Sequence, residues 1–369
     1  MVDISIILPC QNEELALEKC LVDCKKYLNK TKYSYEIIVS DSSTDSSPKI
    51  AKKHRAVLVK HDKDGYGTAY MEGVHVSKGR YLIFLDADYT YDFSYIPLFV
   101  KELENGADFV IGNRFSGKME VGAMPFLNKY LGNPVLSFLT RLLFQTKVAD
   151  VHCGMRGITR TFFDRLDLHT TGMEFATEMV VKSIRQKGVL KEIPISYRKR
   201  LGESKLRPLN DAWRHIRFML LYSPFYVFFL PALLFLGIGL SSFIGIYTGF
   251  FGLNIHPLFL SSLCIITGVQ LLFLGFFAKT YAVVHLKQQS VFLQKVYTFF
   301  RLERLLVLGF FGILLSCAIF LFVFYSWAQS GFGELSMVKE VLLGATLCIV
   351  SIQSIFSGFM VSIIGIESR

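Results

Sequence analysis

The sequence lacks the signatures of several common classes of nucleotide-binding and metal-binding protein. No GxGxxG follows the first strand-like run, and no GxxxxGK followed by Ser or Thr occurs, which disfavours a dinucleotide-binding fold and a P-loop. The seven cysteines form no CxxC pair, so we expect reduced thiols and neither a zinc site nor a redox centre. No basic leader followed by an apolar core stands at the N-terminus, so we expect no secretory signal.

Charged residues are nearly absent from four long stretches in the second part of the chain. The chain has 369 residues, of which 52% are hydrophobic, and most of this apolar excess follows Ser223. The four stretches are 224–250, 257–278, 305–327 and 341–366. Because about 20 apolar residues let a helix cross a bilayer, we predict an integral, multi-pass membrane protein with an all-α transmembrane domain of four helices at 224–369. Core helices of a large soluble domain are the alternative.

Lysine and arginine are missing from two of the loops between these stretches, 248–256 and 328–337. The loop 279–304 instead contains Lys279, Lys287, Lys295, Arg301 and Arg304 against the single acid Glu303. Since Lys and Arg near span ends favour the cytoplasmic side, we expect the N-terminal domain, loop 279–304 and the C-terminus in the cytoplasm, at the plasma membrane of a prokaryote, with the spans paired as two hairpins. The net charge of +10 then favours membrane lipids over nucleic acid as a partner.

The first part of the chain alternates strand-like and helix-like segments. Strand-like runs at 3–8, 36–40, 56–60, 81–85 and 109–112 are separated by helix-like segments at 13–28, 46–54, 68–76 and 95–103. Such alternation predicts an α/β domain with a mostly parallel sheet. Gln11, Asn12 and Glu13 follow the first run and Asp41 follows the second, which places polar groups in a nucleotide-sized crevice at the carboxyl edge of the sheet.

Two carboxylates end the apolar segment RYLIFLDAD at 80–88, and they are Asp86 and Asp88. Carboxylate oxygens suit Mg²⁺ or Mn²⁺, which share their remaining positions with waters and substrate phosphates; solvated turn acids are the alternative. Gly65 and Gly67 form a glycine-rich turn before a helix, where backbone N–H groups could approach a phosphate. A tight turn without a ligand explains these glycines as well.

Eight motifs in a fixed order carry a resemblance that covers the whole chain. They are LPCQNEE at 8–14, SDSSTDSS at 40–47, GYGTAYMEG at 65–73, DADYTYD at 86–92, IGNRFSG at 111–117, DVHCGMRG at 150–157, TGMEFATEM at 171–179 and RLGESKLR at 200–207. In these motifs the chain resembles the family 2 glycosyltransferases of GT-A fold, and within them the polyprenyl-phosphate membrane enzymes similar to dolichol-phosphate mannose or glucose synthases. The resemblance implies a cytoplasmic GT-A catalytic domain at 1–207.

The resemblance also implies how the donor is held. Residues that would bind the nucleotide sugar are Pro9, Asn12, Glu13, Asp41, Gly65, Gly67 and Asp86, with Asp86 and Asp88 on the metal. Thr90 stands where relatives often have Gln, so a third metal ligand is open; His152 is a candidate, and a structural histidine is the alternative. A UDP-sugar is favoured because Asp41, DADYTYD and TGMEFATEM look closer to glucose-type relatives, while GDP-mannose stays open.

The acceptor implied by the resemblance is a polyprenyl or dolichyl phosphate, which is already a nucleophile because its second proton is lost near pH of about 6. Glu174 and Glu178, four residues apart, would position the donor or a basic side chain, unless they form the solvated face of a helix. Arg156 would clamp a phosphate or fix its own loop. The predicted catalytic residues are therefore Asp88, Arg114, Arg156, Glu174 and Glu178.

Basic residues near the membrane would hold the lipid phosphate, and the candidates are Arg114, Lys129, Arg200 and Lys205, with 116–125 as an acceptor loop. A patch that attracts anionic lipids is the alternative. Between 208 and 223, Leu209, Trp213, Ile216 and Leu220 fall on one side of a helix. We expect this amphipathic helix, and a similar one at 281–300, to lie along the membrane interface.

Together these features predict a metal-dependent hexosyltransferase that moves one sugar from a nucleotide sugar to the lipid phosphate by direct displacement, which inverts the anomeric centre. A processive polysaccharide synthase is one alternative, but the QxxRW segment is absent and Trp213-Arg214 has the reverse order. A membrane channel or scaffold that binds nucleotide sugars is another. Its spans would need functional polar residues, and the interior candidates are Gln270 and Gln353, neither of which is ionisable.

Overall fold

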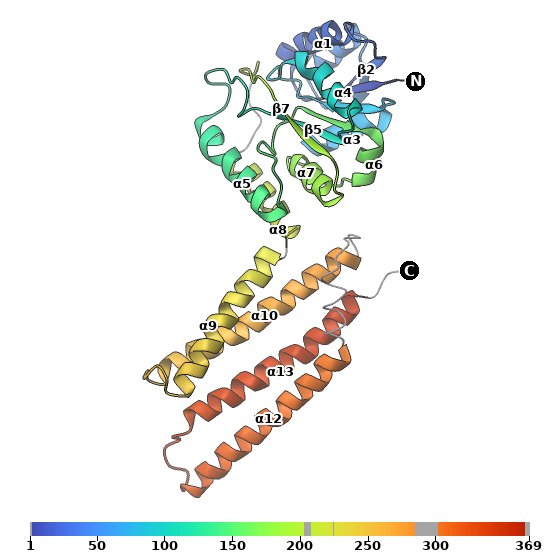
Figure 1. Ribbon diagram of the computed structural model, residues 1–369. Helices are drawn as coiled ribbons and strands as arrows, with labels where there is room; N and C mark the ends of the chain where they lie inside the picture. The colour runs from blue at the N-terminus through green and yellow to red at the C-terminus, as the bar shows by residue number, and fades with distance from the viewer. Residues whose placement is uncertain (1, 203–207, 224, 285–301, 366–369) are drawn as a thin grey trace. The chain divides into compact units, whose positions relative to one another are not determined.

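The computed structural model describes residues 2–202, 208–223, 225–284 and 302–365. The chain divides into two compact units, Met1–Tyr222 and Ser223–Arg369 (Figure 1). The predicted helix at 281–300 lies almost wholly outside the described residues, as do Lys205 and most of the basic loop 279–304.

A seven-stranded sheet forms the centre of the first unit. In chain order its strands are β1 (Ile4–Cys10), β2 (Tyr35–Asp41), β3 (Val57–Lys60), β4 (Tyr81–Phe84), β5 (Phe109–Asn113), β6 (Arg156–Thr159) and β7 (Leu190–Pro194). Their spatial order is β3-β2-β1-β4-β6-β5-β7. β6 runs antiparallel to β4 and β5, and the other neighbouring pairs are parallel. The predicted mostly parallel α/β sheet is therefore confirmed, with one reversed strand at its middle.

Helices cover both faces of this sheet, since all residues of β4 and β5 are buried. The helices of the first unit are α1 (Glu14–Leu28), α2 (Ser47–Lys53), α3 (Tyr66–Val76), η1 (Phe93–Tyr95), α4 (Ile96–Glu104), η2 (Asn128–Gly132), α5 (Asn133–Phe144), α6 (Arg160–Leu166), α7 (Phe175–Arg185) and α8 (Pro208–Leu221). The core is apolar and continuous, from Ile4 in β1 through Phe84 in β4 to Phe109 in β5. The sheet is thus a rigid support for side chains at its carboxyl edge.

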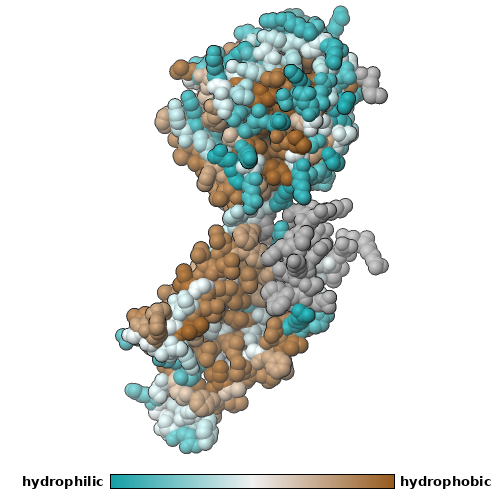
Figure 2. All heavy atoms as spheres, viewed as in Figure 1, coloured by the Kyte–Doolittle hydropathy of each residue, from teal (hydrophilic) through white to brown (hydrophobic). Residues whose placement is uncertain are grey.

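The second unit consists of long apolar helices. They are η3 (Phe225–Phe229), α9 (Leu230–Tyr247), α10 (His256–Val284), α12 (Leu302–Gln329) and α13 (Val338–Ile364). Four of the described helical segments are long and apolar enough to cross a membrane: Phe225–Tyr247, His256–Tyr281, Leu302–Gln329 and Val338–Ile364. The four predicted spans are confirmed, and they pair as two hairpins (Figure 1) whose outward surface is apolar (Figure 2).

Among the described residues of this second unit, hydroxyl contacts join helices α10, α12 and α13 where small residues meet. Ser262 of α10 and Thr346 of α13 are hydrogen-bonded through their hydroxyls. The Ser316 hydroxyl of α12 donates to the carbonyl of Gly344 in α13 at 2.8 Å. Such contacts hold helices together where lipid offers no hydrophobic drive for their association.

Candidate functional site

Three neighbouring strands end at the same edge of the sheet and bring the predicted acids together. Cys10 at the end of β1 pairs in register with Asp41 of β2, and Ile7 of β1 pairs with Phe84 of β4. Asp86 and Asp88 follow β4 directly. The sequence prediction that these strand ends share one crevice edge therefore agrees with the register of the sheet.

One carboxylate oxygen of Asp86 accepts hydrogen bonds that hold the side chain in place, and the other oxygen does not take part in these bonds. Its Oδ1 accepts hydrogen bonds from the hydroxyls of Tyr66 at 2.9 Å and Tyr70 at 3.2 Å. Its Oδ2 lies beside Gly154, where a Cβ would come within 2.5 Å. Burial, with the neighbouring Asp88, raises the pKa of Asp86 to about 6. Such a carboxylate is stabilised when a cation approaches it.

Asp88 has the same division between its two oxygens. Its Oδ1 accepts hydrogen bonds from the backbone N–H of Thr90 at 3.0 Å and from the Thr90 hydroxyl at 2.6 Å. Its Oδ2 lies 3.7 Å from Nη2 of Arg200. Thr90 therefore orients the metal-binding candidate Asp88 instead of supplying the carbonyl ligand of a Gln. One oxygen from each acid remains for a hard divalent cation, and this donor set fits Mg²⁺ or Mn²⁺.

His152 does not join these acids as a third ligand. Within the described ranges, no group of three or more His, Cys, Asp or Glu side chains is placed to hold a metal ion. The His152 ring instead packs edge-on against His215 of α8, with ring centroids 4.3 Å apart. Burial, with the neighbouring His215, holds the pKa of His152 well below its usual range. The structural reading of His152 is the one that its contacts support.

Asp41 has the strongest unmet hydrogen-bonding demand at this edge. Its side chain is fully buried, yet neither oxygen has a partner in the described part of the chain. A buried carboxylate without donors is costly, so a ligand N–H or O–H is expected there. Pro9 of β1, which is partly buried, pairs in register with Ser40, next to Asp41.

Asn12 shapes the loop after β2. It adopts a left-handed backbone conformation with φ of 54°. Its Oδ1 accepts hydrogen bonds from the backbone N–H of Thr44 at 2.8 Å and of Asp45 at 3.3 Å. Asn12 therefore holds the loop after β2 against the end of β1.

The two predicted glycines are required by a backbone contact. A Cβ at Gly65 would lie 2.3 Å from the carbonyl oxygen of Thr171, and one at Gly67 would lie 2.4 Å from that of Thr170. Gly65 also has a φ of 122°, which favours glycine. The N–H of Thr68 donates to the carbonyl of Thr171 at 3.1 Å. These contacts support the tight-turn reading of this segment.

Glu178 stabilises the segment that touches those glycines. Its buried carboxylate accepts hydrogen bonds from the backbone N–H of His169 and Thr170, from the Thr170 hydroxyl at 2.6 Å, and pairs with Lys182 at 2.9 Å. A carboxylate so fully engaged is a positioning group, and its pairing with Lys182 fits the predicted role of Glu178 in positioning a basic side chain. Glu174 differs, because its Oε2 is buried without a partner among the described residues.

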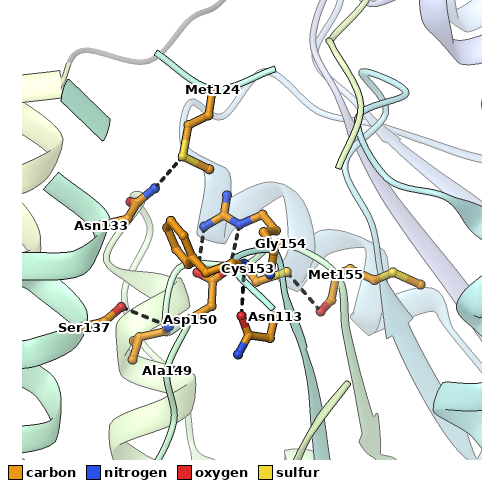
Figure 3. Close-up of polar contacts among 12 residues, drawn as sticks. Asn113, Met124, Asn133, Ser137, Ala149, Asp150, Cys153, Gly154 and Met155 are labelled. Carbon is orange, nitrogen blue, oxygen red and sulfur yellow. Dashed lines mark hydrogen bonds and ion pairs between the residues drawn. The ribbon is translucent and has the colours of Figure 1, made fainter. Parts of the chain in front are cut away.

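Arg114, predicted to bind the lipid phosphate, and Arg156, predicted to clamp a phosphate or fix its own loop, are both buried and engaged. Arg114 donates through Nε and Nη2 to the two oxygens of Asp150, at 2.7 and 2.8 Å. Figure 3 shows Asp150 and the polar contacts around it. Arg156 donates from all three of its side-chain nitrogens to the carbonyls of Cys153, Ala176 and Val151. Arg156 therefore fixes its own loop, the alternative role given above.

Several residues of this loop network are absent from the sequence prediction. Glu192 of β7 accepts the backbone N–H groups of Ala149 and Asp150 at 2.9 and 3.0 Å. The Tyr91 hydroxyl accepts the N–H of Gly154 at 2.7 Å. Because Gly154 abuts Asp86, these contacts set the space beside the metal-binding candidate. Motif membership was the only sequence signal for Asp150 and Tyr91.

The predicted lipid-phosphate residues have different surroundings. Arg200 lies at the acids, with its Nη2 3.1 Å from Oε1 of Glu13. Lys129 lies on η2, with Nζ 5.2 Å from the ring centroid of Tyr130. Arg114 is paired as described, and Lys205 is outside the described residues. Among the predicted lipid-phosphate residues that the structure describes, Arg200 lies beside both Glu13 and Asp88.

An apolar surface lies on 121–142 and on α8. Exposed apolar side chains on the first segment are Val121, Phe126, Leu127, Tyr130, Leu131, Val135, Phe138 and Leu142. On α8, Trp213 is exposed, while His215, Phe218 and Met219 are buried. The Thr140 hydroxyl of α5 contacts Sδ of Met219 at 3.0 Å. The predicted amphipathic helix at 208–223 is present as α8, and the sequence did not predict its apolar neighbour α5.

Two family models match the chain. The model described as "Glycosyl transferase family 2" matches residues 5–167. The model described as "Glycosyltransferase family 2 C-terminal transmembrane region" matches residues 276–365. Both halves of the chain are thus matched by families of the same enzyme class.

Two relatives come from Haloferax volcanii. The low-salt glycan biosynthesis hexosyltransferase Agl6 is 31% identical over 367 residues, which cover 98% of this chain and 89% of that protein. The dolichyl-phosphate hexose transferase is 30% identical over 207 residues, 56% of this chain and 87% of that protein.

Solved structures with a similar fold are more distant. A glucosyl-3-phosphoglycerate synthase from Mycobacterium tuberculosis, in complex with Mn²⁺, UDP and glucosyl-3-phosphoglycerate, is 20% identical with a TM-score of 0.47, covering 60% of this chain and 78% of that chain. A mannosyl-3-phosphoglycerate synthase from Rubrobacter xylanophilus is 17% identical with a TM-score of 0.49, covering 60% and 73%.

The full-length match to Agl6, the two family models and the four spanning helices agree with one another. The first unit has the GT-A fold that the motifs implied, and the second is a transmembrane region. The chain is an integral membrane glycosyltransferase and belongs to glycosyl transferase family 2.

Proposed function

We propose that this glycosyltransferase transfers a single sugar from a nucleotide sugar to a polyprenyl or dolichyl phosphate, with inversion, at the cytoplasmic face of the membrane, and that it requires Mg²⁺ or Mn²⁺. The observation that carries the proposal is the sheet edge where Asp86 and Asp88 each keep one oxygen free of the hydrogen bonds that fix the other. The similarity to the dolichyl-phosphate hexose transferase of Haloferax volcanii supports the choice of acceptor.

Asp41 supports a nucleotide donor. Its two buried oxygens without partners in the described ranges would accept N–H groups from the base. Uracil offers one N–H between two carbonyls, and guanine offers N–H groups on a ring nitrogen and on an amino group. A UDP-sugar is the favoured donor from the motif variants, and a GDP-sugar remains the alternative to be separated by assay.

Asp86 and Asp88 would hold the cation, and Tyr66, Tyr70 and Thr90 would keep their carboxylates in place. A divalent ion bound there offsets the charge that develops on the departing nucleoside diphosphate. Gly154 leaves room for the oxygen of Asp86 that would face the ion. The residues Arg114, Arg156 and Glu178 act by fixing the loops around this edge.

A lipid phosphate needs a cationic partner more than a strong base, because it is already ionised near neutral pH. Arg200, whose guanidinium lies beside Glu13 and Asp88, would bind the lipid phosphate. Glu174, with its buried oxygen lacking a partner in the described chain, would orient the sugar or the incoming phosphate. The apolar surfaces of η2, α5 and α8 would keep the cleft at the headgroup layer, where the lipid presents its polar end.

The test uses the purified full-length protein in nanodiscs with a short polyprenyl phosphate and Mn²⁺. A panel of radiolabelled UDP-glucose, UDP-galactose, UDP-N-acetylglucosamine and GDP-mannose should give a lipid-linked sugar with one of them. The anomeric configuration of that product, read by NMR, should be β from an α-linked donor. Absence of a lipid-linked product with every donor of a full panel would refute the proposed transfer.

A further inference from the structure

Arg200 lies between two carboxylates of the candidate site with one donor unused. Its Nη2 is 3.1 Å from Oε1 of Glu13 and 3.7 Å from Oδ2 of Asp88. Its Nε is buried and has no hydrogen-bond partner in the part of the chain that the structure describes. A guanidinium carries five N–H donors, and here the Nε–H is left without an acceptor in the described part of the chain while Nη2 is shared between Glu13 and Asp88.

Arg198 in the same segment offers a comparison. Its Nη2 lies 2.9 Å from Oδ2 of Asp92, and its side chain is 27% exposed against 23% for Arg200. Asp92 caps η1 by accepting the N–H of Ser94 at 3.0 Å. The two arginines are thus similarly buried, but Arg200 pairs with acids of the site and Arg198 pairs with an acid that holds a helix.

The oxygen of Asp88 that faces Arg200 is the oxygen that a metal would use. The other oxygen, Oδ1, is occupied by the N–H and hydroxyl of Thr90. A carboxylate bond to Mg²⁺ is about 2.1 Å long. With the guanidinium 3.7 Å from the same oxygen, the two cations would lie only a few ångströms apart and would repel each other.

We propose that Arg200 takes the metal's side of Asp88 in the ligand-free enzyme and that an arriving divalent cation displaces it, which frees its guanidinium for the phosphate of the acceptor. The inference rests on the metal-dependent transfer proposed above and names the step that links its two substrates.

Displacement moves the side chain and leaves its segment in place. The N–H of Arg198 donates to the carbonyl of Thr90 at 2.8 Å, and the N–H of Leu201 donates to the carbonyl of Asp88 at 3.1 Å. Nε and Nη2 form the side of the guanidinium that matches two phosphate oxygens. Nε is already open, and Nη2 loses its contact with Asp88 when Asp88 turns to the metal, while its contact with Oε1 of Glu13 at 3.1 Å remains. The side of the guanidinium that can meet a phosphate is therefore more open with the metal than without it.

The first experiment measures Mn²⁺ affinity of the full-length protein without either substrate, from the loss of the free Mn²⁺ signal in electron paramagnetic resonance. Arg200→Gln should bind Mn²⁺ roughly five- to tenfold more tightly than the wild type, because a competing like charge is gone. Arg198→Gln should bind it as the wild type does. Equal or weaker binding by Arg200→Gln overturns the proposal, since a residue that serves only the acceptor would leave Mn²⁺ affinity unchanged.

The second experiment needs no variant and so does not depend on folding of Arg200→Gln. Phenylglyoxal modifies accessible guanidinium groups, and mass spectrometry of the peptides gives the rate at each arginine. Mn²⁺ alone should accelerate modification of Arg200 and leave Arg198 unchanged; an unchanged or slower rate at Arg200 overturns the exchange. Wild-type protein that binds no Mn²⁺ would also remove the proposed metal dependence, whereas Mn²⁺ binding without these effects removes the exchange alone.

Discussion

Gly154→Ala should weaken metal binding at Asp86 and Asp88 while leaving the fold in place. The added Cβ would lie 2.5 Å from Oδ2 of Asp86 and 2.9 Å from the Tyr91 hydroxyl. Ordinary contacts begin near 3.4 Å, so the carboxylate must move by about 0.9 Å (3.4 − 2.5). Metal ligands tolerate deviations of only about 0.2 Å, and a misplacement of about 1 Å costs roughly a hundredfold in rate.

The assay is sugar transfer to the lipid phosphate at saturating donor, together with Mn²⁺ affinity by electron paramagnetic resonance. We expect kcat/KM to fall about a hundredfold and Mn²⁺ binding to weaken in parallel. Gly132→Ala is the matched control, because its Cβ would meet its nearest neighbour at 3.6 Å and should leave both unchanged. A Gly154→Ala enzyme with wild-type rate and Mn²⁺ affinity would refute the assignment of Oδ2 of Asp86 to the metal.

Four further outcomes are expected. Asp88→Asn, and EDTA treatment of the wild type, should abolish transfer without changing the melting temperature in detergent; full activity in either case contradicts the metal role. Glu178→Gln should destabilise the first unit by about 3 kcal/mol, because it places an amide N–H against backbone N–H donors, and a loss of kcat at unchanged melting temperature would instead restore a catalytic role. Burial lowers the pKa of His215 to about 4, so this side chain is neutral in the folded state. Its stabilising contribution of about 3 kcal/mol is complete above pH 6.5 and is lost as the pH falls through 4, and His152 acts in the same direction. Thermal unfolding across this pH range should therefore show a shallower pH slope for His215→Gln than for the wild type. Alkaline phosphatase fused after Leu253 should be active, and phosphatase fused at the C-terminus should be inactive; the reverse pattern would place the catalytic unit outside.

The sequence predicts those parts of the site that depend on strand order alone. Asp86 and Asp88 end a strand with no charge in its apolar run, and parallel strands deliver their carboxyl ends to one edge, so the position of both acids follows from local pattern. The four spans follow in the same way from length and hydropathy. Both predictions use short-range information, which sequence carries directly.

Side-chain partners across long sequence separations do not follow from such patterns. Arg114 looks like a phosphate ligand until Asp150, 36 residues later, is seen to occupy two of its donors. Glu178 shares helical spacing with Glu174, but its partners lie in the loop at 169–170, so one carboxylate is engaged while the other keeps an open oxygen. A motif identifies conspicuous residues and does not distinguish a group that binds substrate from one that fixes a loop.

The reversed strand β6 imposes an order on how the nascent chain can assemble. β4 leaves the ribosome long before its neighbour β6, and β5, made in between, lies next to β4 only through β6. Until Arg156–Thr159 is synthesised, β4 has one open edge of apolar residues and β5 is free to pair with it wrongly in parallel. Productive folding therefore requires a late strand to enter between two early ones. A ribosome-stalling series with arrest points on either side of residue 159 would locate this step as the onset of protease resistance.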